Sequence, residues 1–451
     1  MSTLRLSAER LGSRAFRSAH KTRYAYASGA MYQGIASPAL VARMAAAGYL
    51  AYLGNGGLPI EQVERDLCEV KSLVPRGCVY GVNLLSQFDD PAAEDAIVEL
   101  ILRHGVTRVE ASAFMQVTPA LAAYRLSGLQ PGTGGSIRCE HLVLGKTSRL
   151  EVASQFLSPV DPALVGQLRC EGRITAQQAE WSSRVAVADD ICVEADSGGH
   201  TDQGVLGVIL PAFLSARAKA ARDFPPAGEV RLGAGGGLGT PEAVAAAFVL
   251  GADFVMTGSV NQCTVEARTH EKVKETLQQA GPADTAICPA GDMLELGAKM
   301  QVLRRGLLFP ARAEKLYEFY RQYQDWFAIP DDARSRIENT YFRRPIVEVL
   351  DELQSRTTAV EWMRVQKKPR ETLAMICRWY FHHTTQWALR GEPGREADYQ
   401  IHCGPALGAF NQIVQGTAME DWRNRHVDHI AEFLMTGAAE VLSRRFEEMT
   451  R

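Results

Sequence analysis

The sequence predicts an α/β protein built on a (β/α)8 TIM barrel, followed by a C-terminal, mostly helical subdomain. Eight short β-rich runs alternate with helical patterns between about residues 24 and 280, and these runs are apolar enough to be buried on both faces. Beyond about residue 283 the pattern changes, and no further strand is expected. An open, doubly wound sheet is the alternative architecture with the same alternation.

The eight expected strands cover residues 24–31, 49–54, 78–85, 106–112, 141–146, 190–196, 229–235 and 253–258. Several helices between them are expected to begin with a proline that follows a hydroxyl N-cap, at Ser37-Pro38, Thr118-Pro119 and Thr240-Pro241. The long crossover at residues 147–189 is expected to hold more than one helix.

These patterns divide the chain into an N-terminal segment (1–23), a barrel (24–282) and a helical subdomain (283–451). Five of the six tryptophans lie in the last part, and tryptophan is more often a core residue than a ligand platform. We therefore expect Trp326, Trp362, Trp379, Trp387 and Trp422 to be buried.

The composition argues against several classes of protein. The 49 basic and 52 acidic residues give a formal net charge of −3, which predicts neither a nucleic-acid partner nor a membrane surface. Nine cysteines without a C-x-x-C pair are typical of reduced thiols, so no metal site is expected. The N-terminal residues lack the apolar stretch of a secretory signal, and we expect a cytoplasmic protein.

Two glycine loops suggest a phosphate site. Gly233, Gly235 and Gly239 are spaced one residue too far apart for the dinucleotide-binding fingerprint of an open sheet. In a barrel, by contrast, phosphate groups bind at the loops after the seventh and eighth strands, near a helix N-terminus. Residues 235–237 and 257–259 occupy these two places, so a phosphate-bearing ligand is expected, with simple tight turns as the alternative.

The stretch EADSGGHTD ends the sixth expected strand and combines Gly198, Gly199 and His200. Glycines allow the backbone to approach a bulky group closely, and histidine is the side chain that changes protonation near neutral pH. A tight turn with a capping aspartate and an exposed histidine is the other interpretation.

Together these segments resemble a known family. GAMYQGIASPALVARMAAAGYLAYLGNGGL, GVNLL, EADSGGHTD and GAGGGLGTPEAVAAAFVLGADFVMTGSVNQC are similar to the FMN-dependent 2-nitropropane-dioxygenase-like barrels. The C-terminal blocks QVLRRGLLFPARAEKLYE, RWYFHHTTQWAL and DYQIHCGPALGAFNQIVQGTAMEDWRNRHV resemble one subgroup, the trans-acting enoyl reductases of bacterial polyketide and polyunsaturated-fatty-acid synthases.

The resemblance implies roles for individual residues. It makes His200 the catalytic residue beside the flavin, with Asn83 on the isoalloxazine edge and Lys146 near the ring or the phosphate. Without it, Asn83 is an ordinary strand-end residue and Lys146 a surface lysine. The implied cofactor-binding set is Ala30, Met31, Tyr32, Asn83, Lys146, Gly198, Gly199, Gly235, Gly236, Gly237, Gly258 and Ser259.

The resemblance also implies a reaction. NADPH would reduce FMN, and the flavin would reduce the α,β-double bond of an enoyl thioester carried on an acyl carrier protein domain of a synthase. NADH in place of NADPH stays open, because the chain contains no separate nicotinamide-nucleotide motif. A nitronate monooxygenase-type flavoenzyme and a non-catalytic, synthase-binding barrel are the alternative functions.

Overall fold

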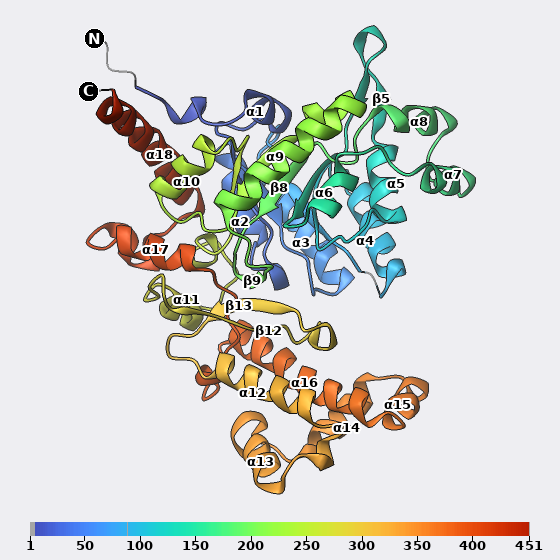
Figure 1. Cartoon of the computed structure of the whole chain (residues 1–451), viewed down its shortest axis with the longest axis vertical. Coiled ribbons are helices and arrows are strands. Elements are labelled where there is room, and N and C mark those ends of the chain that lie inside the picture. Colours follow the sequence, from blue (N-terminus) through green and yellow to red (C-terminus); the bar gives the residue numbers. More distant parts are fainter. Residues whose placement is uncertain (1–4, 88, 451) are drawn as a thin grey trace. The chain divides into compact units, whose positions relative to one another are not determined.

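Eight parallel strands close into a barrel in the computed structural model, which describes residues 5–87 and 89–450 (Figure 1). Each strand pairs with its predecessor and successor among the eight, and the last pairs with the first. The predicted TIM barrel and all eight of its strands are therefore confirmed. The strands are β1 (Tyr26–Ser28), β2 (Leu50–Leu53), β3 (Gly81–Leu85), β4 (Arg108–Ser112), β7 (Leu142–Thr147), β8 (Asp190–Glu194), β10 (Arg231–Gly235) and β11 (Val255–Thr257).

Helices cover the outside of the barrel. The three predicted caps are confirmed, because the side chains of Ser37, Thr118 and Thr240 each accept a hydrogen bond from a backbone N–H of the first turn. The crossover between β7 and β8 holds three helices, as predicted. The helices are α2 (Pro38–Ala46), α3 (Ile60–Leu73), α4 (Pro91–Arg103), α5 (Pro119–Ser127), α6 (Leu150–Phe156), α7 (Pro162–Cys170), α8 (Ala176–Trp181), α9 (Leu206–Asp223) and α10 (Pro241–Val249).

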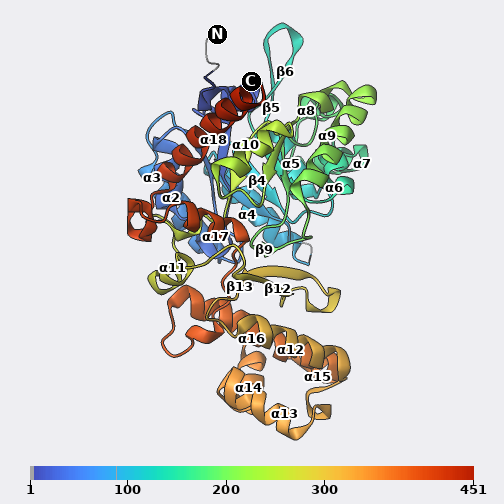
Figure 2. The same ribbon diagram turned by 60° about the vertical axis from the view of Figure 1, so that its left-hand side comes forward.

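Two features of this part of the chain did not follow from periodicity. A short hairpin of β5 (Leu129–Pro131) and β6 (Ile137–Cys139) projects between α5 and β7. The C-terminal helix α18 (Val427–Met449) returns to the barrel and packs against α10 and α2, as Figures 1 and 2 both show for α10.

The amino-terminal end of the barrel is filled by α1 (Arg14–His20). The ring of Phe16 stacks on Phe254 with centroids 4.4 Å apart, and both side chains are fully buried in the barrel core. Nε2 of His20 lies 2.8 Å from Oδ2 of Asp190, and Arg231 forms an ion pair with the same carboxylate. The predicted N-terminal segment therefore contributes core residues, beginning with Ala8 and Leu11 ahead of α1, while its first four residues lie outside the described part of the chain.

The chain forms two compact units, each with its own internal contacts. The first comprises residues 1–196, 203–268 and 413–451, and the second comprises residues 197–202 and 269–412. The boundary that we predicted near residue 283 differs from this division, because α18 belongs with the barrel and the segment Ser197–Asp202 belongs with the second unit.

The second unit combines a small sheet with helices. Its antiparallel strands β9 (Gly199–His200), β12 (Thr285–Pro289) and β13 (Lys299–Leu303) pair in the order β12-β13-β9. Helices α12 and α16 contact each other, and α12 contacts β12 (Figure 1). The helices of this unit are α11 (Glu271–Leu277), α12 (Phe309–Gln322), α13 (Asp331–Arg336), α14 (Ile346–Arg356), α15 (Ala359–Gln366), α16 (Pro369–Arg390) and α17 (Pro405–Ile413), whose last residue falls in the first unit.

The expectation that no strand follows residue 283 was wrong. β12 and β13 are five residues each, and a single short helical turn, Leu294–Leu296, lies between them. Their conformation depends on pairing with each other and with β9, about 100 residues earlier, which local propensity does not encode.

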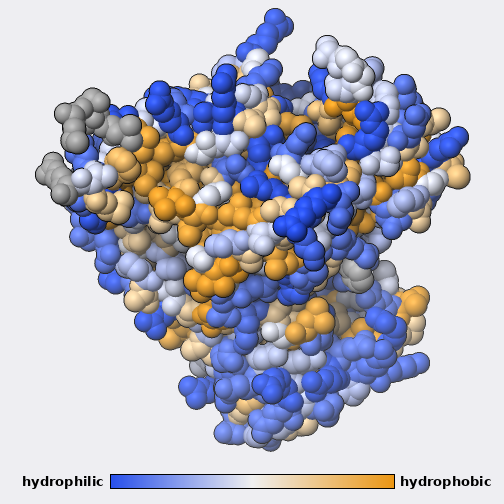
Figure 3. Space-filling model, turned by 45° about the horizontal axis from the view of Figure 1, so that its top comes forward, coloured by the Kyte–Doolittle hydropathy of each residue, from blue (hydrophilic) through white to orange (hydrophobic). Residues whose placement is uncertain are grey.

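The five C-terminal tryptophans are buried, as predicted, with exposed fractions of 3 to 9%. Hydrophobic residues on the face drawn in Figure 3 form patches within a largely hydrophilic surface. Within the described residues, no helix combines the length and the apolarity needed to cross a membrane.

Candidate active site

A half-buried lysine, with 21% of its side chain exposed, lies among carboxylates at the carboxyl ends of the barrel strands. Nζ of Lys146 on β7 is 3.1 Å from Oε1 of Glu110 on β4 and 3.7 Å from Oε1 of Glu194 on β8. Burial works against the charge on Lys146, but the two carboxylates outweigh it and hold its pKa above the ordinary lysine value. Lys146 is therefore a fixed cation at neutral pH.

Glu110 also holds the loop that follows β1. Its side chain is completely buried, and its Oε2 accepts a hydrogen bond of 2.8 Å from the backbone N–H of Ala30. One carboxylate thus ties the β1 loop to Lys146. Sequence reasoning missed Glu110 because it lies inside the run VTRVEAS, although a lone acid in an apolar strand was a signal that could have found it.

Asn83 on β3 is fixed by its neighbours. The hydroxyl of Ser112 donates to Oδ1 of Asn83 at 2.9 Å and also lies 3.3 Å from Oε1 of Glu110. The side chain of Asn55 donates to the backbone carbonyl of Asn83 at 2.6 Å. These bonds set the orientation of the Asn83 amide and connect it to the cluster around Lys146.

The loop after β1 packs closely against the loop after β2. A Cβ added to Gly54 would lie 2.1 Å from the carbonyl oxygen of Met31, and one added to Gly57 would lie 2.7 Å from the ring of Tyr32. Only glycine permits this approach. Ala30, Met31 and Tyr32, whose main chain we predicted to contact a cofactor, therefore lie in a loop that is held on both sides.

The two glycine loops contain two kinds of glycine. A Cβ on Gly235 would lie 2.8 Å from Sγ of Cys192, and one on Gly236 would lie 2.5 Å from the carbonyl oxygen of Ala195, so the packing of the barrel requires these two. A Cβ on Gly237 or Gly258 would meet no atom within 4 Å.

The two open glycines lie on neighbouring strands. β10 and β11 pair Gly235 with Met256, and Gly237 and Gly258 each follow two residues later. Each leaves open space where a Cβ would lie: Gly258 directly precedes Ser259, and Gly237 precedes α10, whose N-terminus favours an anion. This space suits the terminal phosphate of a cofactor.

The structure places His200 on β9, in the second unit. Its Nε2 lies 2.9 Å from Oδ1 of Asp292, and its side chain is about half exposed, at 48%. Desolvation works against the charge on Asp292, but the hydrogen bond and the charge of His200 outweigh it and lower the pKa of Asp292. Sequence reasoning missed Asp292, which is 92 residues away along the chain.

The packing and backbone conformation of the second unit explain why the two residues before His200 are glycines. A Cβ on Gly198 would lie 2.8 Å from the backbone of Cys403, and Gly199 has a φ of +87°. Beside them, burial and the charge of His200 lower the pKa of His402 to about 4, so His402 is neutral at pH 7. The expected roles of Gly198 and Gly199 at a cofactor remain predictions.

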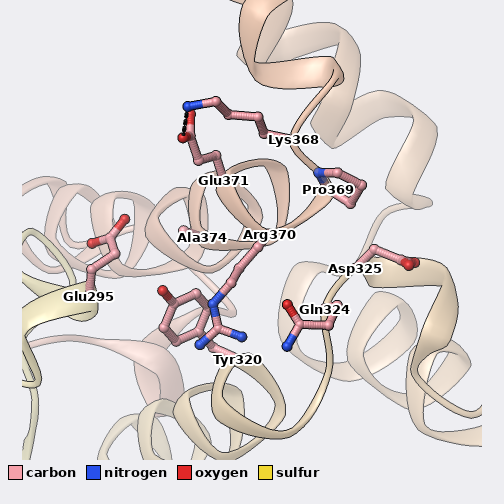
Figure 4. Close-up of a pocket in the computed structure, with 9 residues that line it drawn as sticks. All are labelled: Glu295, Tyr320, Gln324, Asp325, Lys368, Pro369, Arg370, Glu371 and Ala374. Atoms are coloured by element: carbon pink, nitrogen blue, oxygen red, sulfur yellow. Dashed lines mark hydrogen bonds and ion pairs between the residues drawn. The ribbon is translucent and has the colours of Figure 1, made fainter.

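The second unit also contains a cavity of about 410 Å³ at the N-terminus of α16 (Figure 4). The guanidinium of Arg370 lies 4.6 Å above the ring of Tyr320 there, and Lys368 forms an ion pair with Glu371. None of the site residues expected from the sequence lines this cavity.

The parallel barrel, with charged and glycine-rich groups at the carboxyl ends of its strands, defines a TIM-barrel protein whose site occupies the usual catalytic end of that fold. Among solved structures, the enoyl reductase domain of MlnA from the macrolactin biosynthesis cluster of Bacillus amyloliquefaciens is 39% identical, with a TM-score of 0.94 over 98% of this chain and 99% of that one. The chain belongs to the family of this enoyl reductase domain.

Longer curated proteins contain the same region. The polyketide biosynthesis protein PksE of Bacillus subtilis is 44% identical over 444 residues, which are 98% of this chain and 58% of PksE. One component of the polyunsaturated fatty acid synthase of Thraustochytrium sp. is 40% identical over 417 residues, which are 91% of this chain and 28% of that component. The chain thus spans little more than half of the first relative and less of the second.

A second similarity is confined to the helical part of the chain. Residues 323–399 match the family described as [acyl-carrier-protein] S-malonyltransferase, inserted helical domain. This segment includes α13, α14, α15 and α16.

We expect Glu110→Gln to destabilise the protein, because it leaves the mostly covered cation of Lys146 with only the more distant Glu194. The free energy of unfolding should fall by about 3 to 5 kcal/mol, which is the usual effect of breaking a buried ion pair. Urea denaturation measures it. Glu140→Gln is the control, because Glu140 forms an exposed ion pair with Arg138. It should lower the free energy of unfolding by less than about 1 kcal/mol. Equal effects of the two variants would contradict a buried charge network.

Proposed function

We propose that the chain is an FMN-dependent enoyl reductase that uses NADPH or NADH and acts in trans on α,β-unsaturated thioesters bound to an acyl carrier protein. The observation that carries this proposal is the 39% identity to the enoyl reductase domain of MlnA over nearly the whole of both chains. The names of PksE and of the fatty acid synthase component support a place in polyketide or polyunsaturated fatty acid biosynthesis.

An acyl carrier protein as partner has separate support. The family matched by residues 323–399 takes its name from an enzyme of acyl carrier protein chemistry. A carrier-bound thioester would also explain why the barrel is accompanied by a second unit of helices.

The residues at the barrel end fit FMN. Gly237, Gly258 and Ser259 would hold its phosphate, since the first two leave open space that a Cβ would fill. Main-chain atoms of Ala30 to Tyr32 and the amide of Asn83 would line the ring. Bound FMN would supply the transfer of hydride from the nicotinamide to the β-carbon of the substrate.

The chain's own side chains prepare the site. Glu110 holds the Ala30 loop and Lys146 together, so the groups facing the ring are rigid before anything binds. Lys146 supplies a permanent positive charge that stabilises negative charge on a neighbouring ring or phosphate. His200 would donate the proton that the α-carbon of the substrate takes up, and Asp292 orients its ring through Nε2.

The function is tested with the purified chain under anaerobic conditions. We expect denaturation to release FMN, NADPH to bleach the bound flavin, and crotonyl-pantetheine to restore its colour. Absorbance near the flavin band measures all three. A colourless protein that FMN does not reconstitute would remove the enzyme proposal, while recovery only with a nitronate and oxygen would favour a nitronate monooxygenase.

Gly237→Leu should abolish flavin binding and leave a folded protein, because the new side chain fills the space beyond Gly237. Gly105→Leu is the matched control. Gly105 also has a positive φ, +66° against +71°, and also meets no atom within 4 Å, but it precedes β4 at the opposite end of the barrel. Both variants carry about 1–2 kcal/mol of backbone strain. The measurements are the flavin content per protein molecule and the circular dichroism spectrum, which reports the fold. If Gly237→Leu retained its flavin, the phosphate would bind elsewhere.

His200→Ala should affect only one half-reaction. Reduction of the bound flavin by NADPH needs no proton donor at the substrate and should change by no more than a few-fold. Reduction of the enoyl thioester should slow by about 10²- to 10⁴-fold, the usual contribution of a positioned acid. Stopped-flow rates normalised to bound FMN measure both steps, and His382→Ala, an exposed histidine of the same unit, is the control. Equal slowing of both steps would exclude His200 as the donor.

A further inference from the structure

Helix α15 of the second unit has an outward surface whose side chains are not buried in the packing of that unit. Trp362 and Val365 face inward and are 5% and 3% exposed. On the opposite side of the helix, at spacings of three and four residues, lie Val360, Met363, Arg364 and Lys367, the last being the C-cap. We call these four residues the α15 face.

The α15 face exposes apolar side chains. Val360 is 76% exposed and Met363 is 56% exposed, on a helix of only eight residues. The outward side of a surface helix is normally polar, and neighbouring exposed apolar side chains with a polar rim are typical of protein-contact sites. Methionine and arginine are also enriched in such contacts.

The charge of the α15 face is positive. The ion pair of Arg364 with Glu361 is long, at 4.0 Å, and both side chains are more than half exposed. Lys367 forms no ion pair with any residue in the described part of the chain. The face itself contains no acidic residue, so its two cations are available to a partner of opposite charge.

We propose that the α15 face docks the acyl carrier protein through an acidic, helical surface of that carrier, an inference that rests on the proposed function. The positive charge selects an acidic partner, and Val360 and Met363 supply the apolar centre of a small contact. The face lies within residues 323–399, the segment with the separate family match. A contact of this kind is transient, as a carrier that must leave after each turnover requires.

Binding is measured directly, without reference to catalysis. The probe is a holo-acyl carrier protein domain of a bacterial polyketide synthase, labelled with a fluorophore on its phosphopantetheine thiol, and the readout is anisotropy with the full chain. Arg364→Glu with Lys367→Glu should weaken binding at least about 10-fold, and added salt should reduce the difference. Val360→Ser with Met363→Ser should weaken binding several-fold and keep the salt dependence.

The matched control reverses two exposed basic residues elsewhere, Arg169→Glu with Arg336→Glu, and produces the same change in net charge. It should alter binding less than about two-fold. Equal weakening by the control, unchanged binding in the α15 variants or no saturable binding by the unaltered chain would each overturn the proposal. Loss of a dimer in the α15 variants without loss of carrier binding would assign the face to a second copy of the chain and overturn it too.

Turnover separates this proposal from the proposed function. The α15 variants should lose kcat/KM for crotonyl on the carrier by about 10-fold and keep it within two-fold for crotonyl-pantetheine. Equal loss on both substrates would overturn docking, because it indicates damage to the reacting site. If the unaltered chain reduces neither substrate, the proposed function fails, and the anisotropy result still decides whether the face binds the carrier.

Discussion

The ion pair between Lys146, which is 21% exposed, and the fully buried Glu110 is the constraint on which the catalytic end of the barrel depends. A cation in an apolar interior is stable only when it is paired and hydrogen-bonded. Glu110 on β4 and Glu194 on β8 provide the pairing, and Glu110 extends it to the backbone of Ala30 after β1. Four strand ends are thus linked through one lysine.

This network explains why the site can be rigid although loops form it. Ser112 joins Asn83 on β3 to Glu110, so the amide of Asn83 cannot turn without breaking a buried hydrogen bond. Gly54 and Gly57 let the loops after β1 and β2 pack at backbone distance. Polar groups held in this way do not have to reorganise when charge develops during a reaction.

At the opposite, amino-terminal end of the barrel, a buried ion-pair cluster stabilises the fold. Asp190 is fully buried and pairs with His20 of α1 and with Arg231 on β10. Burial works against the charge on Asp190, but these two partners outweigh it and lower its pKa to about 2. The pair therefore stabilises the fold above about pH 4, and that contribution is lost as the pH falls toward 2. Together with Phe16 on Phe254, it closes this end against water.

Local patterns in the sequence determined the eight barrel strands, the Ser37, Thr118 and Thr240 caps and the buried tryptophans, because strand alternation, capping and hydrophobicity act over a few residues. The family resemblance, rather than any local rule, indicated an enoyl reductase. Tertiary structure alone decided what depends on distant residues: the β12–β13–β9 sheet, the place of α18 on the barrel and the partnership of His200 with Asp292. It also distinguished Gly237 and Gly258, which face open space, from Gly235 and Gly236, which are needed for packing. A glycine in the sequence can meet either requirement, close packing or open space, and only the surrounding atoms in the folded structure show which one applies.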